Sequence, residues 1–529
     1  MHFFRHSSLR ICPGILLAMF VGGCAVVGPD YQPQAEPTLP AQWNAADAAV
    51  AARTASQWWQ QFHDPVLDTL IDRGARQNLS LEAAGLRIVQ ARAALGISEA
   101  LIFPQQQQLS GSLGKLYRNE HSFNSVGVGF DVGWEMDIWG KYARGIESSE
   151  ASLYASVASY RDVLISITAE IARNYINYRT AQERALLSRQ NIAIQQRVVE
   201  MTQVQFDSGN VTELDVQQAK TQLYGTQATL PALTIARVQS RNALAVLLGV
   251  LPDDITPLLA LEPDQDDSTY HAQIALSADE YDARSIIPRG PMLEDKVNSA
   301  LVLRRPDLQV AELQARAQSA RIGLAEAALY PQFFLFGSIG LSDSVPSGGS
   351  FSASNAVTAA IGPGFSWNIF QYERIKNQVR IEDARFQESL TNYNQQVLQA
   401  VQEVSNALVA YRYLVAQSEY NFSAVSASIR AFNISSTQYN NGLVTYQRLL
   451  STVEKMTLRQ DAYALTKGNI ANQVVALYKA LGGGWEPHTG IPIVKPETVE
   501  TMRGRIDWGD ALAPEQLQVQ SVTGAQPSE

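Results

Sequence analysis

Long stretches of the chain carry apolar residues at helical spacing. Residues 146–208 and 365–441 contain neither glycine nor proline, and each run is far longer than the roughly 11–12 residues of an average helix. Within the first run, Leu164, Ile167 and Ile171 follow one another at steps of three and four. A narrow apolar stripe with polar residues around the rest of each turn is typical of coiled-coil packing. We therefore predict two very long helices that pack along thin seams.

A tight turn follows each long helix. Gly209 closes the first helix and Gly442 the second, and glycine adopts the left-handed backbone of such a turn without steric cost. Gly225 and Pro231 then interrupt the first returning helix, which predicts a kink there. We predict two helical hairpins, at about 141–248 and at about 371–481.

Short segments with two-residue alternation precede each hairpin. Val128, Phe130 and Val132 fall on one face, with glycine and polar residues between them, which is the pattern of a membrane β-strand. Two pairs of strands are predicted, at 105–118 with 123–137 and at 331–342 with 356–369. Because a membrane barrel needs at least eight strands, four strands per chain must be shared among several chains.

The two halves of the chain resemble each other. Phe206-Asp-Ser-Gly-Asn-Val-Thr at 206–212 corresponds to Tyr439-Asn-Asn-Gly-Leu-Val-Thr at 439–445. The same offset of 233 residues carries Gly249 onto Gly482 without a gap. Matching segments in the same order predict a two-fold internal repeat of roughly 200 residues.

The start of the chain predicts export and lipidation. Arg5 and Arg10 precede a short apolar stretch at 11–21, as in a secretory signal peptide. Val21-Gly22-Gly23-Cys24 resembles the lipobox of bacterial lipoproteins, in which small residues precede the modified cysteine. We therefore expect residues 1–23 to be removed and Cys24 to carry a diacylglycerol thioether and an N-acyl chain.

The composition excludes some functions. The chain has 41 Lys and Arg against 51 Asp and Glu, a formal net charge of −10, which argues against nucleic acid as a partner. After the signal segment, no stretch approaches the roughly 18 apolar residues of a membrane-spanning helix, so a membrane role would use strands. Cys12 lies in the removed segment, which leaves Cys24 as the only cysteine of the mature chain.

An enzyme would need a convergent group of acid–base or metal-binding residues, and the sequence offers little. His63-Asp64 precedes Pro65 at a helix start, where a capping role is expected. Asp131, Glu135 and Asp137 alternate along a strand, which predicts a polar lumen-facing surface rather than a metal site. A structural coiled-coil or adhesin lipoprotein would explain the long helices but not the four strands. Conductance in a planar bilayer would distinguish a channel from both alternatives.

Together these features resemble the TolC-like outer membrane efflux proteins, in particular the lipoprotein branch typified by OprM and NodT. The resemblance covers about 24–485. It is carried by Cys24-Ala-Val-Val-Gly-Pro-Asp-Tyr, Trp58-Trp59, Arg304-Arg305-Pro306-Asp307-Leu308, Gly209-Asn-Val-Thr, Gly442-Leu-Val-Thr and Leu477-Tyr-Lys-Ala-Leu-Gly.

The resemblance implies a mixed α+β membrane protein and a homotrimer. Four strands from each chain would form one 12-stranded barrel in the outer membrane of a Gram-negative bacterium, and the hairpins would form a periplasmic tunnel. The protein would be a passive, gated conduit, with no catalytic residues, no metal and no cofactor. Its partners would be a periplasmic adaptor, an inner-membrane pump, expected to be of the RND type, and outer membrane lipid. The sequence does not name the cargo.

The same resemblance implies a domain order. We expect a signal peptide at 1–23, a first repeat at 24–290 with strands at about 105–137 and an equatorial linker at 250–290, a second repeat at 291–485 with strands at about 331–369, and a disordered tail at 486–529. The two turns would dock the adaptor. The expected docking residues are Gly209, Val211, Thr212, Gly442, Val444 and Thr445. The two glycines could serve only to make the turn, whereas the Val-Thr pairs are harder to explain in that way, since an exposed turn has no need of a valine.

The entrance departs from the pattern of relatives, in which acidic residues on the second hairpin, just past the tip turn, often ring the entrance. The offset of 233 places Arg448 at the position of Asp215, and Ser451 follows one turn later. An acidic ring is therefore missing from the second half. Asp215 and Arg448 would lie at one height on alternating hairpins and either pair across neighbouring hairpins, which helps to close the entrance, or stand as two separately solvated side chains.

Overall fold

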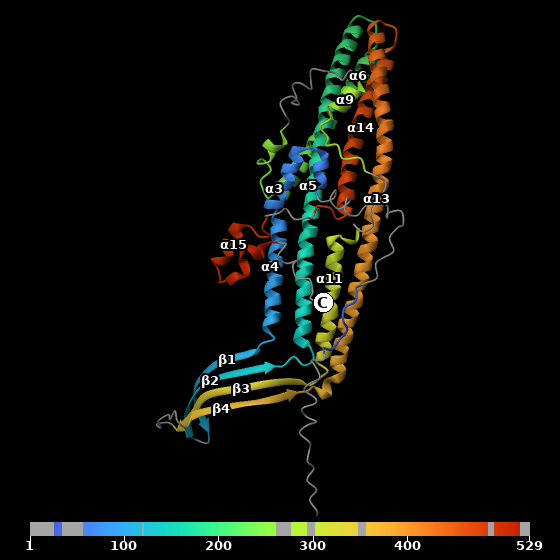
Figure 1. Cartoon of the computed structure of the whole chain (residues 1–529). Coiled ribbons are helices and arrows are strands. Elements are labelled where there is room, and N and C mark those ends of the chain that lie inside the picture. Colours follow the sequence, from blue (N-terminus) through green and yellow to red (C-terminus); the bar gives the residue numbers. More distant parts are fainter. Residues whose placement is uncertain are drawn as a thin grey trace, which may run out of the picture. The chain divides into compact units, whose positions relative to one another are not determined.

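The computed structural model describes residues 26–33, 57–118, 121–260, 277–293, 302–346, 356–484 and 491–518 (Figure 1). The predicted signal peptide and Cys24 lie outside these residues. The chain divides into two compact units. The first unit comprises Met1–Glu36, Arg87–Ser156 and Gln309–Asn394, and the second comprises Pro37–Leu86, Val157–Leu308 and Gln395–Glu529. Each unit therefore draws segments from both predicted repeats.

The first unit contains one antiparallel sheet in the order β1-β2-β3-β4 (Figure 1). Its strands are β1 (Gln106–Arg118), β2 (His121–Glu135), β3 (Gln332–Pro346) and β4 (Val357–Ser366), which confirms the four predicted strands. The two halves of the chain meet at the centre of the sheet, where Gly129 of β2 lies opposite Gly340 of β3. A Cβ at Gly340 would lie 2.8 Å from the Val128 carbonyl oxygen, so this close approach requires glycine.

The acidic residues of β2 and the segment after it fasten the strand to the following helix. Both oxygens of Glu135 lie 2.9 Å from the Lys141 ammonium, and one accepts a hydrogen bond from Tyr142. Asp137 accepts from the Ala143 amide at 2.8 Å. These two carboxylates therefore have a structural role at the start of the helix, and the lumen-facing role expected from their alternation stays a prediction.

Both long helices are observed, as α5 (Lys141–Asp207) and α13 (Tyr372–Asn440). Their returning partners are α6 (Glu213–Gln227) with α7 (Thr229–Leu248) in the first hairpin, and α14 (Tyr446–Ala480) in the second. The predicted kink lies at Ala228, between α6 and α7. Pro231 sits in the first turn of α7, where its missing N–H leaves no hydrogen bond unmade. The remaining longer helices are α3 (Pro65–Gln77), α4 (Leu79–Ala100) and α11 (Pro306–Ala327).

None of the described helices is both long and apolar enough to cross a membrane.

The second unit has an apolar core that both hairpins share. Leu187 and Val198 of α5 pack with Val425 of α13 and with Leu449 and Val453 of α14. The linker between the repeats joins this core through Tyr281 of α9 (Ala278–Ala283). Because residues of three distant segments fill one core, the two hairpins are held as one body in this unit.

The start of the second unit rests on aromatic packing and a helix cap. Trp58 of η2 (Trp58–Phe62) stacks on Tyr478 of α14, with ring centroids 5.5 Å apart. Asp64 accepts hydrogen bonds from the amides of Val66 and Leu67 at 3.0 and 3.1 Å. The predicted capping role of Asp64 is thus confirmed.

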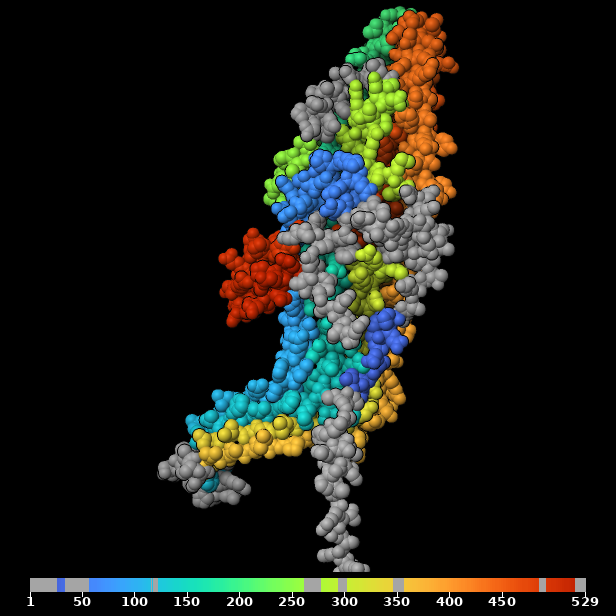
Figure 2. Space-filling model, viewed as in Figure 1, coloured from blue at the N-terminus to red at the C-terminus, as the bar shows by residue number. Residues whose placement is uncertain are grey.

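The predicted disordered tail is wrong for residues 491–518. They form α15 (Pro496–Arg503), η6 (Gly509–Leu512) and η7 (Pro514–Leu517), which gather as a small lobe (Figure 2, red). Ile493 is only 2% exposed, and its carbonyl oxygen would lie 1.8 Å from a Cβ at Gly85. Lys495 forms an ion pair with Glu82 at 3.0 Å. The polar composition of this segment gave no indication that Ile493 is buried against Gly85 of α4.

Candidate docking and gate region

The two hairpin turns have the same backbone structure (Figure 1, upper end). In the first turn, the amides of Gly209 and Asn210 bond back to the carbonyls of Phe206 and Gln205, at 2.8 and 2.9 Å. The second turn repeats both bonds 233 residues later, at 2.9 and 2.8 Å. This pair of bonds is the Schellman arrangement that ends a helix. The two tips therefore share one hydrogen-bond pattern at the offset of 233 residues on which the predicted repeat is based.

Backbone conformation explains both turn glycines. Gly209 has φ +76° and Gly442 has φ +69°, in the left-handed region that disfavours other residues. A Cβ at either position would meet no atom of the chain within 4 Å. The space around each glycine is open, so a side chain placed there would project away from the chain.

The apolar surface of the tips lies on residues that the sequence reasoning missed. Leu214 is 65% exposed and Leu443 is 74% exposed, and each lies next to a turn. The predicted valines are less open. Val211 is half-buried, and Val444 packs against the shared core of the second unit. Both valines are therefore partly buried, which gives them a structural reason, and their docking role stays a prediction. The apolar residue directly after Gly442 was the available signal for Leu443.

Asp215 is a helix cap in the first hairpin. Its Oδ2 accepts from the amide of Thr212 at 2.9 Å and from the Thr212 hydroxyl at 2.8 Å. The first of these bonds satisfies a backbone amide that the helix leaves unpaired, and the negative charge suits the positive end of the helix dipole. Asp215 therefore stabilises the start of α6, whether or not it also has a role at an entrance.

The second hairpin has no such cap. Thr445 occupies the capping position of α14, and the residue three positions later is the exposed Arg448. An arginine accepts no hydrogen bond, and its positive charge opposes the helix dipole. Within the described part of the chain, the Arg448 side chain makes no ion pair or hydrogen bond. Ser451, one turn later, is half-buried.

Two tyrosines close the apolar core just below the second turn. Tyr439 and Tyr446 are both buried, and their rings meet edge to face with centroids 6.1 Å apart. Burial raises the pKa of both phenols above the usual value, and the nearby Asp215 carboxylate adds to the rise. Both tyrosines therefore stay neutral and hold the last turn of α13 against the first turn of α14. The sequence reasoning did not single them out.

Comparison with known proteins identifies the family. The sequence profile of the outer membrane efflux proteins matches residues 70–250 and 297–483. The chain belongs to this family. The two matched segments cover both helical hairpins, and the family resemblance predicted from the sequence is confirmed.

Relatives of this outer membrane efflux protein match it along nearly its whole length. Nodulation protein T of Rhizobium leguminosarum bv. trifolii is 27% identical and covers 89% of this chain and 96% of its own. The toluene efflux pump outer membrane protein TtgC of Pseudomonas putida is 26% identical, over 92% of this chain and 98% of its own. The chain is therefore an outer membrane component of an efflux system.

Solved structures share the fold. The outer membrane channel OprN is 28% identical, covers 87% of this chain and 100% of its own, and superposes with a TM-score of 0.74. CusC is 24% identical, covers 87% of this chain and 100% of its own, and superposes with a TM-score of 0.72. At this identity the similarity supports the fold only. The predicted architecture of hairpins and strands is therefore that of outer membrane channels.

Proposed function

We propose that this protein is the channel of a tripartite efflux system and works as a homotrimer. The observation that carries the proposal is the four-stranded sheet, whose edge strands β1 and β4 have no partner within the described chain. An open sheet edge exposes a row of unpaired backbone groups. Three copies that pair β1 of one chain with β4 of the next would remove all edges and form a closed 12-stranded barrel.

The side chains of the two edge strands support a lipid-facing barrel. On β1, Leu109 and Leu113 are 74% and 85% exposed and lie four residues apart, on one face. On β4, Ile361 and Phe365 are 81% and 68% exposed with the same spacing. Such apolar exposure is costly in water and is expected where strands face hydrocarbon.

The mature chain would be anchored through lipid on Cys24, and the tips would bind a periplasmic adaptor. Leu214 and Leu443 add exposed apolar surface beside the proposed docking residues Gly209, Thr212, Gly442 and Thr445. Val211 and Val444 would support the turns from below. The adaptor would connect the channel to an inner-membrane pump, for which the RND type is our proposal.

The entrance would be held by charged pairs between neighbouring hairpins. Both hydrogen bonds to Asp215 go to Oδ2, so its Oδ1 is open to Arg448 of a hairpin beside it. Ser451 would line the same opening one turn away. Each exposed pair is worth only about 0.2–1 kcal/mol, but a trimer would have three copies acting on one opening.

Planar-bilayer recording of the purified protein tests the channel, and discrete conductance steps are the expected result.

Docking is tested with two variants at one position. Gly442→Asn keeps the left-handed turn, because asparagine tolerates that conformation, whereas Gly442→Trp also places bulk in the open space above the tip. We expect normal trimers from both and loss of efflux from Gly442→Trp alone. Normal efflux by a folded Gly442→Trp trimer would contradict docking at this turn.

A further inference from the structure

A cavity beside the first hairpin is lined by two arginines of α7, Arg237 and Arg241. Its volume is about 450 Å³, within the range of small-molecule sites in proteins. Tyr178 and Gln182 of α5 form a second wall, and η3 (Thr256–Leu259) of the linker between the repeats forms a third. Three segments thus place guanidinium, amide and hydroxyl groups around one space.

Within the described residues, neither arginine has a buried acidic partner. The two side chains start four residues apart on α7, where like charges share one face and repel each other. Arg237 makes no ion pair or hydrogen bond with any described residue. The Nε of Arg241 is buried without a hydrogen-bond partner there, and its terminal nitrogens reach only the exposed Asp253, at 3.8 Å, and Asn242, at 3.4 Å. Because a buried donor without an acceptor is costly, both arginines are short of an anion.

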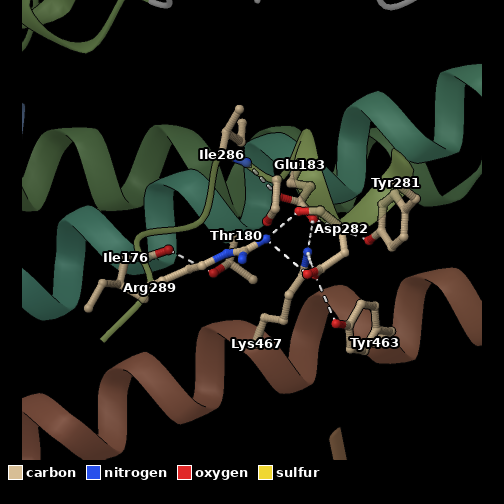
Figure 3. Close-up of polar contacts among 10 residues, drawn as sticks. Ile176, Thr180, Glu183, Tyr281, Asp282, Ile286, Arg289, Tyr463 and Lys467 are labelled. Atoms are coloured by element: carbon tan, nitrogen blue, oxygen red, sulfur yellow. Dashed lines mark hydrogen bonds and ion pairs between the residues drawn. The ribbon is translucent and has the colours of Figure 1, made fainter. Parts of the chain in front are cut away.

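Two acidic residues of the same unit already serve other cations (Figure 3). Glu183, which directly follows Gln182, is fully buried and lies 3.0 Å from the Lys467 ammonium of α14. Asp282 of α9 accepts a hydrogen bond from Arg289 at 2.9 Å. Neither carboxylate lines the cavity. The fold thus supplies carboxylates to these two cations but not to the arginines of α7.

The other walls of the cavity combine hydrogen-bond donors with apolar surface. The buried Arg179 donates through Nη1 to the Gln182 amide oxygen at 2.9 Å and to the Leu259 carbonyl oxygen at 3.1 Å. Because its oxygen is engaged in this way, the Gln182 amide keeps its NH2 group for another acceptor. Tyr178, Val238 and Leu259 add apolar surface to the same cavity. The lining therefore suits a ligand with an anionic group and a compact apolar body.

We propose that this space, the arginine cavity, binds a small organic anion, namely a carboxylate or phosphate that carries an apolar group. The anionic group would lie between Arg237 and Arg241, since planar guanidinium groups donate parallel hydrogen bonds to such anions. It would replace the repulsion between two like charges by attraction to a shared anion. The chain has a formal net charge of −10, so its overall field repels anions, and binding would depend on this local cavity.

Binding would have a structural consequence for the linker between the repeats. A ligand in contact with α5, α7 and η3 at once would hold η3 against the first hairpin, because a ligand stabilises the arrangement that binds it. The inference does not depend on conduction through the protein. It is therefore tested on the purified full chain, without a membrane.

Titration calorimetry with four probes tests the class of ligand. Benzyl phosphate and phenylacetate carry an anionic group on an apolar body, whereas benzyl alcohol lacks the charge and inorganic phosphate lacks the body. We expect at least one of the two organic anions to bind with one site per chain. Benzyl alcohol and inorganic phosphate should bind about tenfold or more weakly. Failure of both organic anions to bind, or equal binding of inorganic phosphate, would overturn the proposal.

Single substitutions test the location. Arg237→Met and Arg241→Met should each weaken binding about tenfold or more, since each removes charge-assisted hydrogen bonds. Arg241→Lys keeps the charge but not the planar fork and should have a smaller effect. The matched control is Arg173→Met, because Arg173 is exposed on α5, pairs with Glu170 at 3.7 Å and does not line the cavity. Equal affinity in folded Arg237→Met and Arg241→Met proteins, or an equal loss in Arg173→Met, would contradict the site.

Hydrogen exchange of the backbone amides at 255–259 gives a second readout. Benzyl phosphate or phenylacetate, whichever binds more tightly, should slow this exchange in the unchanged protein and in Arg173→Met but not in Arg241→Met. A ligand that binds without slowing exchange there in the unchanged protein would not lie against η3, and the proposed site would be wrong.

The acidic residues that follow the cavity in the sequence provide the last test. Residues 262–267 carry four carboxylates and lie outside the described residues. The variant Glu262→Gln/Asp264→Asn/Asp266→Asn/Asp267→Asn removes all four charges. Similar affinity for the organic anion in this variant and in the unchanged protein supports the proposal. Binding to this variant alone would mean that the chain's own carboxylates occupy the cavity, and it would overturn a site for a free anion.

Discussion

The missing cap of the second hairpin yields a quantitative prediction for Arg448→Asp. In the first hairpin, Asp215 bonds to the Thr212 amide and hydroxyl at 2.9 and 2.8 Å. An aspartate at the equivalent position would find the Thr445 amide and hydroxyl in the same arrangement, because both turns share one backbone structure. The substitution should therefore stabilise the start of α14.

The size of the gain follows from two effects. Removing a positive charge from a helix N-terminus and adding a negative one are each worth about 0.3–1 kcal/mol, and a capping hydrogen bond adds about 0.5–1.5 kcal/mol. A total of about 1–3.5 kcal/mol corresponds to roughly 5- to 300-fold slower opening of the first turns. Hydrogen exchange of the backbone amides at 449–453 measures that opening directly.

Matched variants separate the cap from the charge. Arg448→Met removes the positive charge without adding a hydrogen-bond acceptor and should give less than half of the effect. Asp215→Ala should accelerate exchange at the start of α6. If exchange at 449–453 is the same in Arg448→Asp and the unchanged protein, the capping argument fails.

The same variant tests the proposed gate. Pairing between Asp215 and Arg448 of neighbouring hairpins predicts a higher conductance in Arg448→Asp, where the pair becomes repulsive. Conductance should fall back in the charge-swapped Asp215→Arg/Arg448→Asp protein, most clearly at low salt, because the Debye length is about 10 Å at 0.1 M. Slower exchange together with unchanged conductance would assign Asp215 to capping alone and would leave the two charges separately solvated.

Two further predictions concern the ends of the chain. Mass spectrometry of the mature N-terminus should find the lipid on Cys24, and an unmodified Cys24 would refute the anchor. Cys24→Ala should reduce sorting to the outer membrane more than it reduces trimer stability. For the C-terminal lobe, burial alone would raise the pKa of Glu82, but hydrogen bonds from Thr498 and Lys495 and the lysine charge outweigh it and hold this pKa below its ordinary value. A depressed pKa stabilises docking of the lobe above the unfolded value of about 4.3, and this contribution is lost as the pH falls through the folded value. Limited proteolysis should therefore release the lobe more readily at pH 3.5 than at pH 7, and the difference should shrink in Lys495→Met.

Local rules explain why the hairpins could be predicted from the sequence. Long runs without glycine or proline can only be read as helices at this length, and a glycine at φ +76° or +69° is required by the turn itself. The break at Ala228 follows in the same way from Gly225 and Pro231. The repeat was predicted because the residues around Gly209 and those around Gly442 match at the same relative positions.

Contacts between distant segments decided the rest. Val444 turned inward because a shared core lies beneath the turn, and residues 491–518 are ordered because Ile493 fits against Gly85 of α4. No local pattern connects these partners.

By itself, the sequence determined the helices, the strands and the family of this protein, since the patterns that define them lie in residues that are neighbours along the chain. Only the tertiary structure decided that Glu183 and Lys467, which are 284 positions apart in the sequence, lie 3.0 Å from each other. The reason is physical. Helical periodicity and turn chemistry act over a few residues, whereas the burial of a charge depends on every segment that packs around it.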